Sequence, residues 1–91
     1  MENVFVYPLR IPSEQLVTSV AKMAKEYKIA FRGNSKSGSF AGGPRILGLS
    51  FSFRGSYQVK GDKLYITIIE KPALVSYSQT FDFLRKILDQ A

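Results

Sequence analysis

The sequence contains neither cysteine nor histidine. Without cysteine the chain can form no disulfide and offers no thiolate to a metal ion. Without histidine it lacks the commonest metal ligand and the side chain most often used as a general base. These two absences exclude disulfide frameworks, thiolate metal sites and the usual histidine-dependent forms of catalysis.

Carboxylates are also few, with seven of them against 13 lysines and arginines. They fall near the amino terminus, on the exteriors of predicted helices, in a predicted tight turn and at a strand end, so no two are placed to share a catalytic or metal site. They are Glu2, Glu14, Glu26, Asp62, Glu70, Asp82 and Asp89. A serine–lysine pair can be formed with Lys36, but serine beside lysine is common in loops. We therefore expect no enzymatic activity, no metal site and no cofactor.

Long apolar runs are missing as well. No run approaches the roughly 18 residues that a membrane-spanning helix needs, and the start of the chain, residues 1–3, is not the basic start of a secretory signal. These features predict a soluble, cytoplasmic protein. A length of 91 residues with 45% hydrophobic content predicts one globular domain over residues 1–91.

What the sequence does contain is positive charge, with a formal net charge of +6. Such an excess favours acidic partners, including nucleic acid and anionic surfaces. It also serves solubility, since a net charge of about 2–8 is usual for a small soluble domain. Charge alone does not decide between these two interpretations.

Alternating apolar residues predict the centre of a sheet over residues 45–70. In residues 47–53, Leu47, Leu49, Phe51 and Phe53 alternate with glycine and serine, which predicts one strand with one buried face. We expect Gly55 to break this strand.

A hairpin is predicted where Gly61 and Asp62 separate two alternating segments. A slip of one residue would turn the apolar side chains to the wrong face, so the pattern fixes the register. The predicted pairs are Val59 with Leu64, Tyr57 with Ile66, and Gln58 with Tyr65.

Two amphipathic helices are predicted, one over residues 13–27 with Ser13 as its N-cap, and one at the carboxy terminus. Ser76 and Gln79 fit a capping box at the start of the second helix.

Further strands are predicted over residues 4–11 and 28–33. Pro8 places the first of these at a sheet edge or ends it early. The glycine- and serine-rich residues 33–45 predict an irregular connection containing a short strand at 39–41.

These elements together predict an α+β fold of the two-layer sandwich type. It has an antiparallel sheet of about five strands with two helices on one face, in the order β-α-β-β-β-β-α. The face beneath the helices carries the alternating apolar residues, and the other face is small and mostly polar.

Three segments, YKIAFRG at residues 27–33, GSYQV at 55–59 and LRKILDQ at 84–90, resemble the layout of the polyhydroxyalkanoic acid system proteins. The element order also resembles a single repeat of the TATA-box-binding-protein-like architecture. The resemblance implies a β-α-β4-α fold and a role near lipid-like storage granules. The insert at 42–44 and the SFSF segment at 50–53 depart from it, and no functional motif is shared, so it implies no site residue.

The sequence is compatible with two kinds of binding site. A space between sheet and helices would suit an apolar ligand, although the same rings could fill a tight core. The candidate ligand-binding residues are Phe51, Phe53, Tyr57 and Phe81. An anion or nucleic-acid site would use exposed basic residues and an exposed ring, although a convincing platform has two or three rings. The candidates for it are Arg32, Lys36, Arg45, Arg54 and Tyr65.

We therefore predict a non-enzymatic binding module for an apolar or amphipathic ligand or for a protein partner. Self-association through a sheet edge is the simplest protein interaction, because unpaired strand edges are templates for pairing. The alternative is a basic nucleic-acid-binding module.

Overall fold

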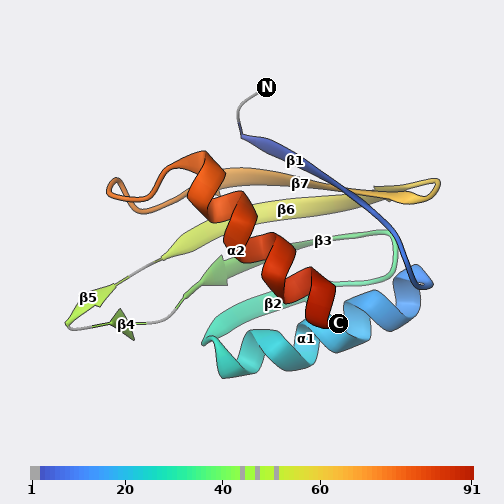
Figure 1. Cartoon of the computed structure of the whole chain (residues 1–91). Coiled ribbons are helices and arrows are strands. Elements are labelled where there is room, and N and C mark those ends of the chain that lie inside the picture. Colours follow the sequence, from blue (N-terminus) through green and yellow to red (C-terminus); the bar gives the residue numbers. More distant parts are fainter. Residues whose placement is uncertain (1–2, 44, 47, 51) are drawn as a thin grey trace.

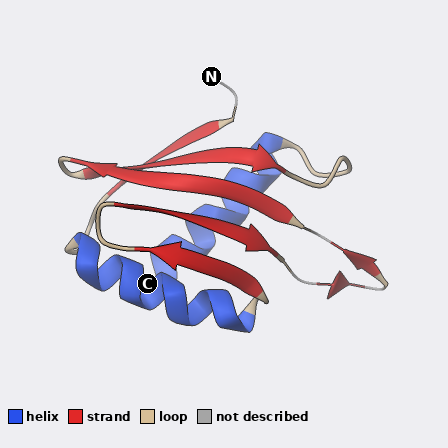
Figure 2. Ribbon diagram, turned by 180° about the vertical axis from the view of Figure 1, so that it is seen from behind, coloured by secondary structure: helices blue, strands red, loops and turns tan. Residues whose placement is uncertain are grey.

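A five-stranded antiparallel sheet forms one layer of the structure, and two helices packed on one face form the other (Figures 1 and 2). The computed structural model describes residues 3–43, 45–46, 48–50 and 52–91. The elements are β1 (Val4–Pro8), α1 (Ser13–Glu26), β2 (Ile29–Gly33), β3 (Ser37–Gly42), β4 (Arg45–Ile46), β5 (Leu49–Ser50), β6 (Phe53–Lys60), β7 (Lys63–Glu70) and α2 (Tyr77–Gln90). Apart from the small β4–β5 hairpin, this is the predicted order, so the predicted α+β sandwich is confirmed. None of the described helices is long and apolar enough to cross a membrane.

The strands of the main sheet are arranged in the order β1-β7-β6-β3-β2. β1 lies at an edge and ends at Pro8, as the missing proline N–H requires, so it is shorter than the predicted strand over residues 4–11. Beyond Pro8 the chain stays close to the sheet, because the Leu9 amide donates to the Asp62 carbonyl at 2.8 Å.

The β6–β7 hairpin has the predicted turn and register. Gly61 takes a φ of +62° in the turn. The observed pairs are Tyr57 with Ile66, Gln58 with Tyr65, and Val59 with Leu64. Tyr57, Leu64 and Ile66 are buried beneath the helices, so the alternating pattern identified the core face correctly.

The single strand predicted over residues 47–53 is wrong. β4 and β5 pair with each other in a separate hairpin beyond the ends of β3 and β6, and β6 begins at Phe53 (Figure 1). The φ of +80° at Gly48 lies in the left-handed region that glycine adopts readily, and it allows the chain to turn between β4 and β5. Leu47 and Phe51 lie outside the described residues.

Gly55 does not end the strand, but the register between β6 and β7 shifts between Arg54 and Gly55, so the predicted break takes the form of an irregularity in the pairing. Gly55 lies within β6 opposite Phe40 of β3. A Cβ at Gly55 would lie 2.6 Å from the Cζ atom of the Phe40 ring, so the missing side chain makes room for that ring.

The glycine- and serine-rich segment contains a full interior strand, β3, paired with β2 on one side and β6 on the other. The predicted strand at 39–41 was therefore correct but too short. Its small residues allow a large neighbour to lie across it, since a Cβ at Gly38 would lie 2.5 Å from the Cε1 atom of Tyr57.

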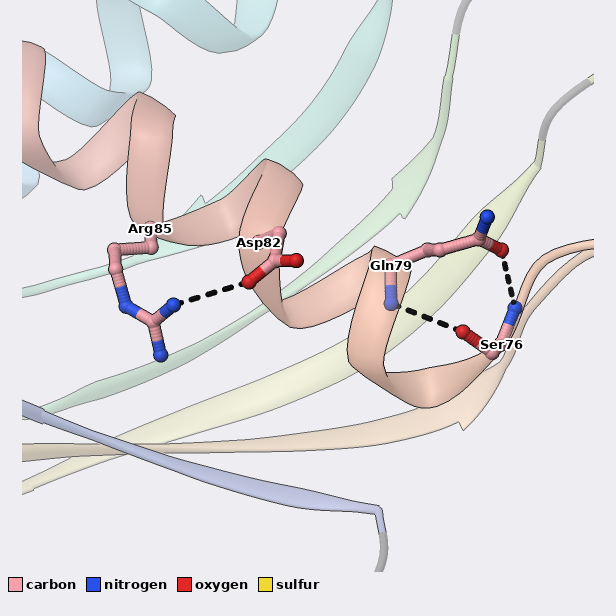
Figure 3. A network of polar contacts seen from close by, with 4 residues as sticks. All are labelled: Ser76, Gln79, Asp82 and Arg85. Atoms are coloured by element: carbon pink, nitrogen blue, oxygen red, sulfur yellow. Dashed lines mark hydrogen bonds and ion pairs between the residues drawn. The ribbon is translucent and has the colours of Figure 1, made fainter.

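The two helices begin differently. α1 follows Pro12 at the N-cap position, where no side chain accepts a hydrogen bond, so the prediction of Ser13 as the N-cap is wrong. α2 has the predicted capping box (Figure 3). The backbone amide of Gln79 donates to Ser76 Oγ at 3.1 Å, and the backbone amide of Ser76 donates to Gln79 Oε1 at 2.9 Å. One turn later Arg85 pairs with Asp82 at 3.0 Å on the exposed side of the helix.

Candidate functional site

An apolar cavity of about 70 Å³ lies between the two helices and the sheet and is partly open to solvent. Such a space departs from the close packing usual in protein interiors. It is lined by Leu16, Val17, Val20, Ala24, Tyr27, Ile29, Phe31, Phe40, Tyr57, Leu64, Ile66, Leu84, Ile87 and Leu88.

The residues of α1 and α2 that line the cavity recur at helical spacing in the sequence. On α1, Leu16, Val20 and Ala24 recur every four residues and therefore share the face turned to the sheet. Ala24 is buried, and its small side chain fills less of the space between the layers than a larger apolar residue would. On α2, Leu84 and Leu88 form the corresponding wall.

The floor of the cavity is aromatic. Phe31 of β2 stacks on Tyr57 of β6 with 5.5 Å between ring centroids and 10° between ring planes. The Tyr57 hydroxyl donates to the Asn34 carbonyl at 2.7 Å, so its polar atom is satisfied in the β2–β3 turn. Burial raises the pKa of this hydroxyl, which keeps the ring neutral. The floor therefore presents an uncharged, orientated ring to any occupant.

A second aromatic group adjoins the cavity at Tyr27. The Tyr27 ring meets Phe83 of α2 edge to face at 5.5 Å, and Phe83 stacks on Phe53 at 6.1 Å. These contacts join the end of α1 to α2 and to the start of β6.

The structure distributes the four predicted ligand-binding residues over different places. Tyr57 lines the cavity, whereas Phe53 is not among its lining residues and stacks on Phe83. Phe81 stacks on Phe5 at 5.3 Å and borders a different, shallow depression on α2. Phe51 lies outside the described residues.

Sequence reasoning missed the contribution of α1 to this site. The spacing of Leu16, Val20 and Ala24 was visible in the sequence as a helical stripe, but it predicts only a buried face. Whether that face meets the sheet tightly or leaves a cavity depends on how the helices cross the strands, which periodicity does not specify.

The predicted anion-site residues do not converge on one point. Arg32 is exposed on β2, and Lys36 is exposed in the β2–β3 turn. Arg54 is exposed on β6 and pairs with Glu70 at 2.7 Å. Tyr65 is half-buried on β7, with the Lys60 Nζ atom 5.9 Å from its ring centroid. Arg45 lies in the separate β4 strand.

The chemistry available to the cavity is narrow. The lining residues that the structure describes carry no charged group, and among them the tyrosines alone supply side-chain oxygens. Within the described ranges, no three acidic residues come together in a group that could hold a metal ion. The cavity is therefore suited to accept apolar groups by burial.

No family model, no curated protein and no solved structure matches this chain. The resemblance to the polyhydroxyalkanoic acid system proteins accordingly stays a prediction from the sequence.

Proposed function

We propose that the protein binds a small apolar or amphipathic molecule whose alkyl part enters the cavity between α1, α2 and the sheet. The observation that carries this proposal is the cavity lining, which consists of aliphatic and aromatic side chains from both helices and four strands. Sites for small molecules are mostly apolar and commonly lie between packed elements.

The size of the cavity favours a slender ligand. An engineered apolar cavity of roughly 150 Å³ accommodates benzene, and this cavity offers about 70 Å³. An unbranched alkyl chain fits the smaller space better than a ring does. Because the cavity is partly open, the remainder of the ligand, including a polar head group, would stay outside.

A neutral probe tests the proposal best, since the basic surface attracts any anionic amphiphile. Titration with 1-octanol should shift the amide resonances of Val20, Ala24, Phe31 and Ile87. It should leave those of Ser39 and Ser56, on the other face of the sheet, unchanged.

A substitution that fills the cavity can be compared with a control substitution outside it. Ala24→Leu places three more carbon atoms in the space and should weaken octanol binding at least tenfold. Ala21→Leu makes the same change on the same helix at a residue that is not part of the lining, and should leave the affinity within twofold. Octanol shifts confined to surface amides, or equal binding by both variants, would sink the proposal.

A further inference from the structure

The positive charge of the protein is segregated from its helices. α1 and α2 together carry four basic and four acidic residues, so the helices have no net charge. Nine basic residues against three acidic ones remain for the strands and connections, which therefore carry the whole net charge of +6. Such a distribution favours anion binding at the strands and connections over binding at the helices.

The face of the sheet turned away from the helices is uncovered by any described element (Figure 2). Residues paired across neighbouring strands share a face, so the registers define this open face as cross-strand rows. One row consists of Arg32, Ser39, Ser56, Thr67 and Val4, and the next of Ser37, Gln58, Tyr65 and Val6. Most of these side chains are short and neutral, and they carry hydroxyl or amide groups.

Three lysines gather at one end of the sheet, and two of them, Lys60 and Lys63, lie on this face. Lys60 and Lys63 are direct partners at the end of the β6–β7 hairpin. Lys36 lies at the same end in the β2–β3 turn, at the edge of this face, because its carbonyl accepts a hydrogen bond of 2.7 Å from the Val59 amide. All three side chains are exposed. Among the described residues, none of the three lies within 4.0 Å of a carboxylate oxygen, so their charges are available to a partner.

An aromatic ring adjoins these lysines on the same face. Tyr65 is in the row next to the Lys60–Lys63 pair, and the Lys60 Nζ atom lies 5.9 Å from its ring centroid. Cationic groups that hold a phosphate backbone, next to a ring on which a base can stack, are the two elements of a single-strand site, here with one ring where larger platforms have two or three.

We propose that the open face of the sheet binds single-stranded nucleic acid, with Lys60 and Lys63 on the face and Lys36 at its edge holding phosphates, and Tyr65 stacking on a base. The short serine and threonine side chains allow the strand to approach closely, and Gln58 offers hydrogen bonds to base edges. This surface is opposite the cavity, so the proposal is independent of apolar-ligand binding.

The alternative anionic partner, a lipid bilayer, fits this surface less well. Adsorption to a bilayer combines basic residues with exposed apolar side chains that enter the interface. Ile69 and Leu74 are exposed large apolar residues, but they lie at or beyond the end of β7, far along that strand from Lys63. Val6, which is 43% exposed, lies nearer the lysines, opposite Tyr65. The Val6 side chain is short and offers little apolar surface to insert into a bilayer.

The first test is the anisotropy of fluorescein-labelled dT15 and U15 oligonucleotides titrated with the full chain. For single strands, the logarithm of the binding constant falls with the logarithm of salt by about 0.7 per neutralised phosphate. Three to four phosphate contacts therefore predict that binding weakens about 20- to 50-fold between 50 and 200 mM salt. Absence of binding at 50 mM salt overturns the proposal.

The second test separates the lysine end from net charge. Lys60→Gln with Lys63→Gln should weaken binding at least tenfold. The matched control, Lys22→Gln with Lys86→Gln, removes the same charge from exposed helix positions and should change it less than twofold. If both double variants lose the same affinity, binding depends on the overall charge and not on the lysine end, and the proposal is overturned. Vesicles containing phosphatidylglycerol serve as a third arm, and binding to vesicles but not to oligonucleotides would assign the face to lipid instead.

Discussion

The Tyr7 hydroxyl donates a hydrogen bond of 2.8 Å to Asp89 Oδ1, which joins the first strand to the last turn of the last helix across 82 residues of sequence. Tyr7 is buried, with 4% of its surface exposed, and Arg10 lies 3.9 Å from the same carboxylate oxygen. This bond fixes the end of α2 over β1, next to the core formed by Phe5 and Leu88. This long-range contact holds the edge strand β1 to the end of α2.

Tyr7→Phe keeps the buried ring and removes only the hydroxyl. We expect the free energy of unfolding to fall by about 0.5–1.5 kcal/mol, the usual net value of one intramolecular hydrogen bond. Urea unfolding measures the change. Tyr65→Phe, on the open face of the sheet, is the control and should stay within about 0.5 kcal/mol of the wild type. If both variants unfold alike, the Tyr7–Asp89 bond contributes nothing to stability.

Alkaline pH should destabilise the protein through its two buried tyrosines. Burial, followed by the hydrogen bond to Asp89, raises the pKa of Tyr7 above 10, and burial raises that of Tyr57. A group whose pKa is raised on folding contributes its full stability below its unfolded pKa and loses it as pH climbs through the folded pKa. The free energy of unfolding should therefore be steady up to about pH 9 and fall above about pH 10.

The contribution of Tyr7 to this decline can be isolated by comparing the wild type with Tyr7→Phe in urea at pH 8, 9, 10 and 11. The lysines titrate in both proteins, so their effect cancels in the difference. The stability gap between the two should shrink above pH 10. A constant gap over this range would contradict the expectation.

The two helix starts offer a matched pair of substitutions. Ser76→Ala removes the hydroxyl that accepts a hydrogen bond from the backbone amide of Gln79, and should lower the free energy of unfolding by about 1 kcal/mol. Ser13→Ala removes a serine at the start of α1, where no side-chain cap is formed, and should change stability by less than about 0.5 kcal/mol. Thermal unfolding of both variants checks the difference, and a larger loss for Ser13→Ala would reverse the assignment of the two caps.

Local sequence signals predicted the elements whose cause is local. The Gly61–Asp62 turn and the alternation on both sides of it fix the β6–β7 hairpin, and Ser76 with Gln79 fixes the start of α2. Strand β3 has a different cause, since Gly38 and its neighbours form a strand because β2 and β6 lie on both sides and supply its hydrogen bonds. Those bonds, and the Tyr57 ring that covers the glycine, come from distant parts of the sequence.

The candidate site shows the same division. The apolar stripe of Leu16, Val20 and Ala24 predicts a buried helix face, and Tyr57 was correctly expected beneath the helices. The cavity itself arises from the difference between the volume these side chains fill and the volume the two layers enclose. That difference depends on the crossing of helices over strands and is not encoded in any single segment.

Gly55 is predicted to be intolerant of any side chain. A Cβ at this position would lie 2.5 Å from the Thr67 carbonyl oxygen and 2.6 Å from the Phe40 ring. Gly55→Ala should therefore destabilise the protein by about 1–3 kcal/mol, as overpacking of a core does. Ser56→Ala, the next residue on the open face, should stay within about 0.5 kcal/mol of the wild type. Urea unfolding measures the change, and a neutral Gly55→Ala would show that the Phe40 ring and the Thr67 backbone can shift without loss of stability.

Tyr65 and Lys60 should contribute to nucleic-acid binding in distinguishable ways. Removal of a stacking ring costs about 1–3 kcal/mol per base and leaves the number of neutralised phosphates unchanged. Tyr65→Leu should therefore weaken dT15 binding at every salt concentration by the same factor, whereas Tyr65→Phe should bind like the wild type. Lys60→Gln should instead reduce the salt slope by about 0.7, because one phosphate contact is lost. Anisotropy titrations at 50, 100 and 200 mM salt resolve the two effects, and a change of slope in Tyr65→Leu, or its absence in Lys60→Gln, would refute these roles.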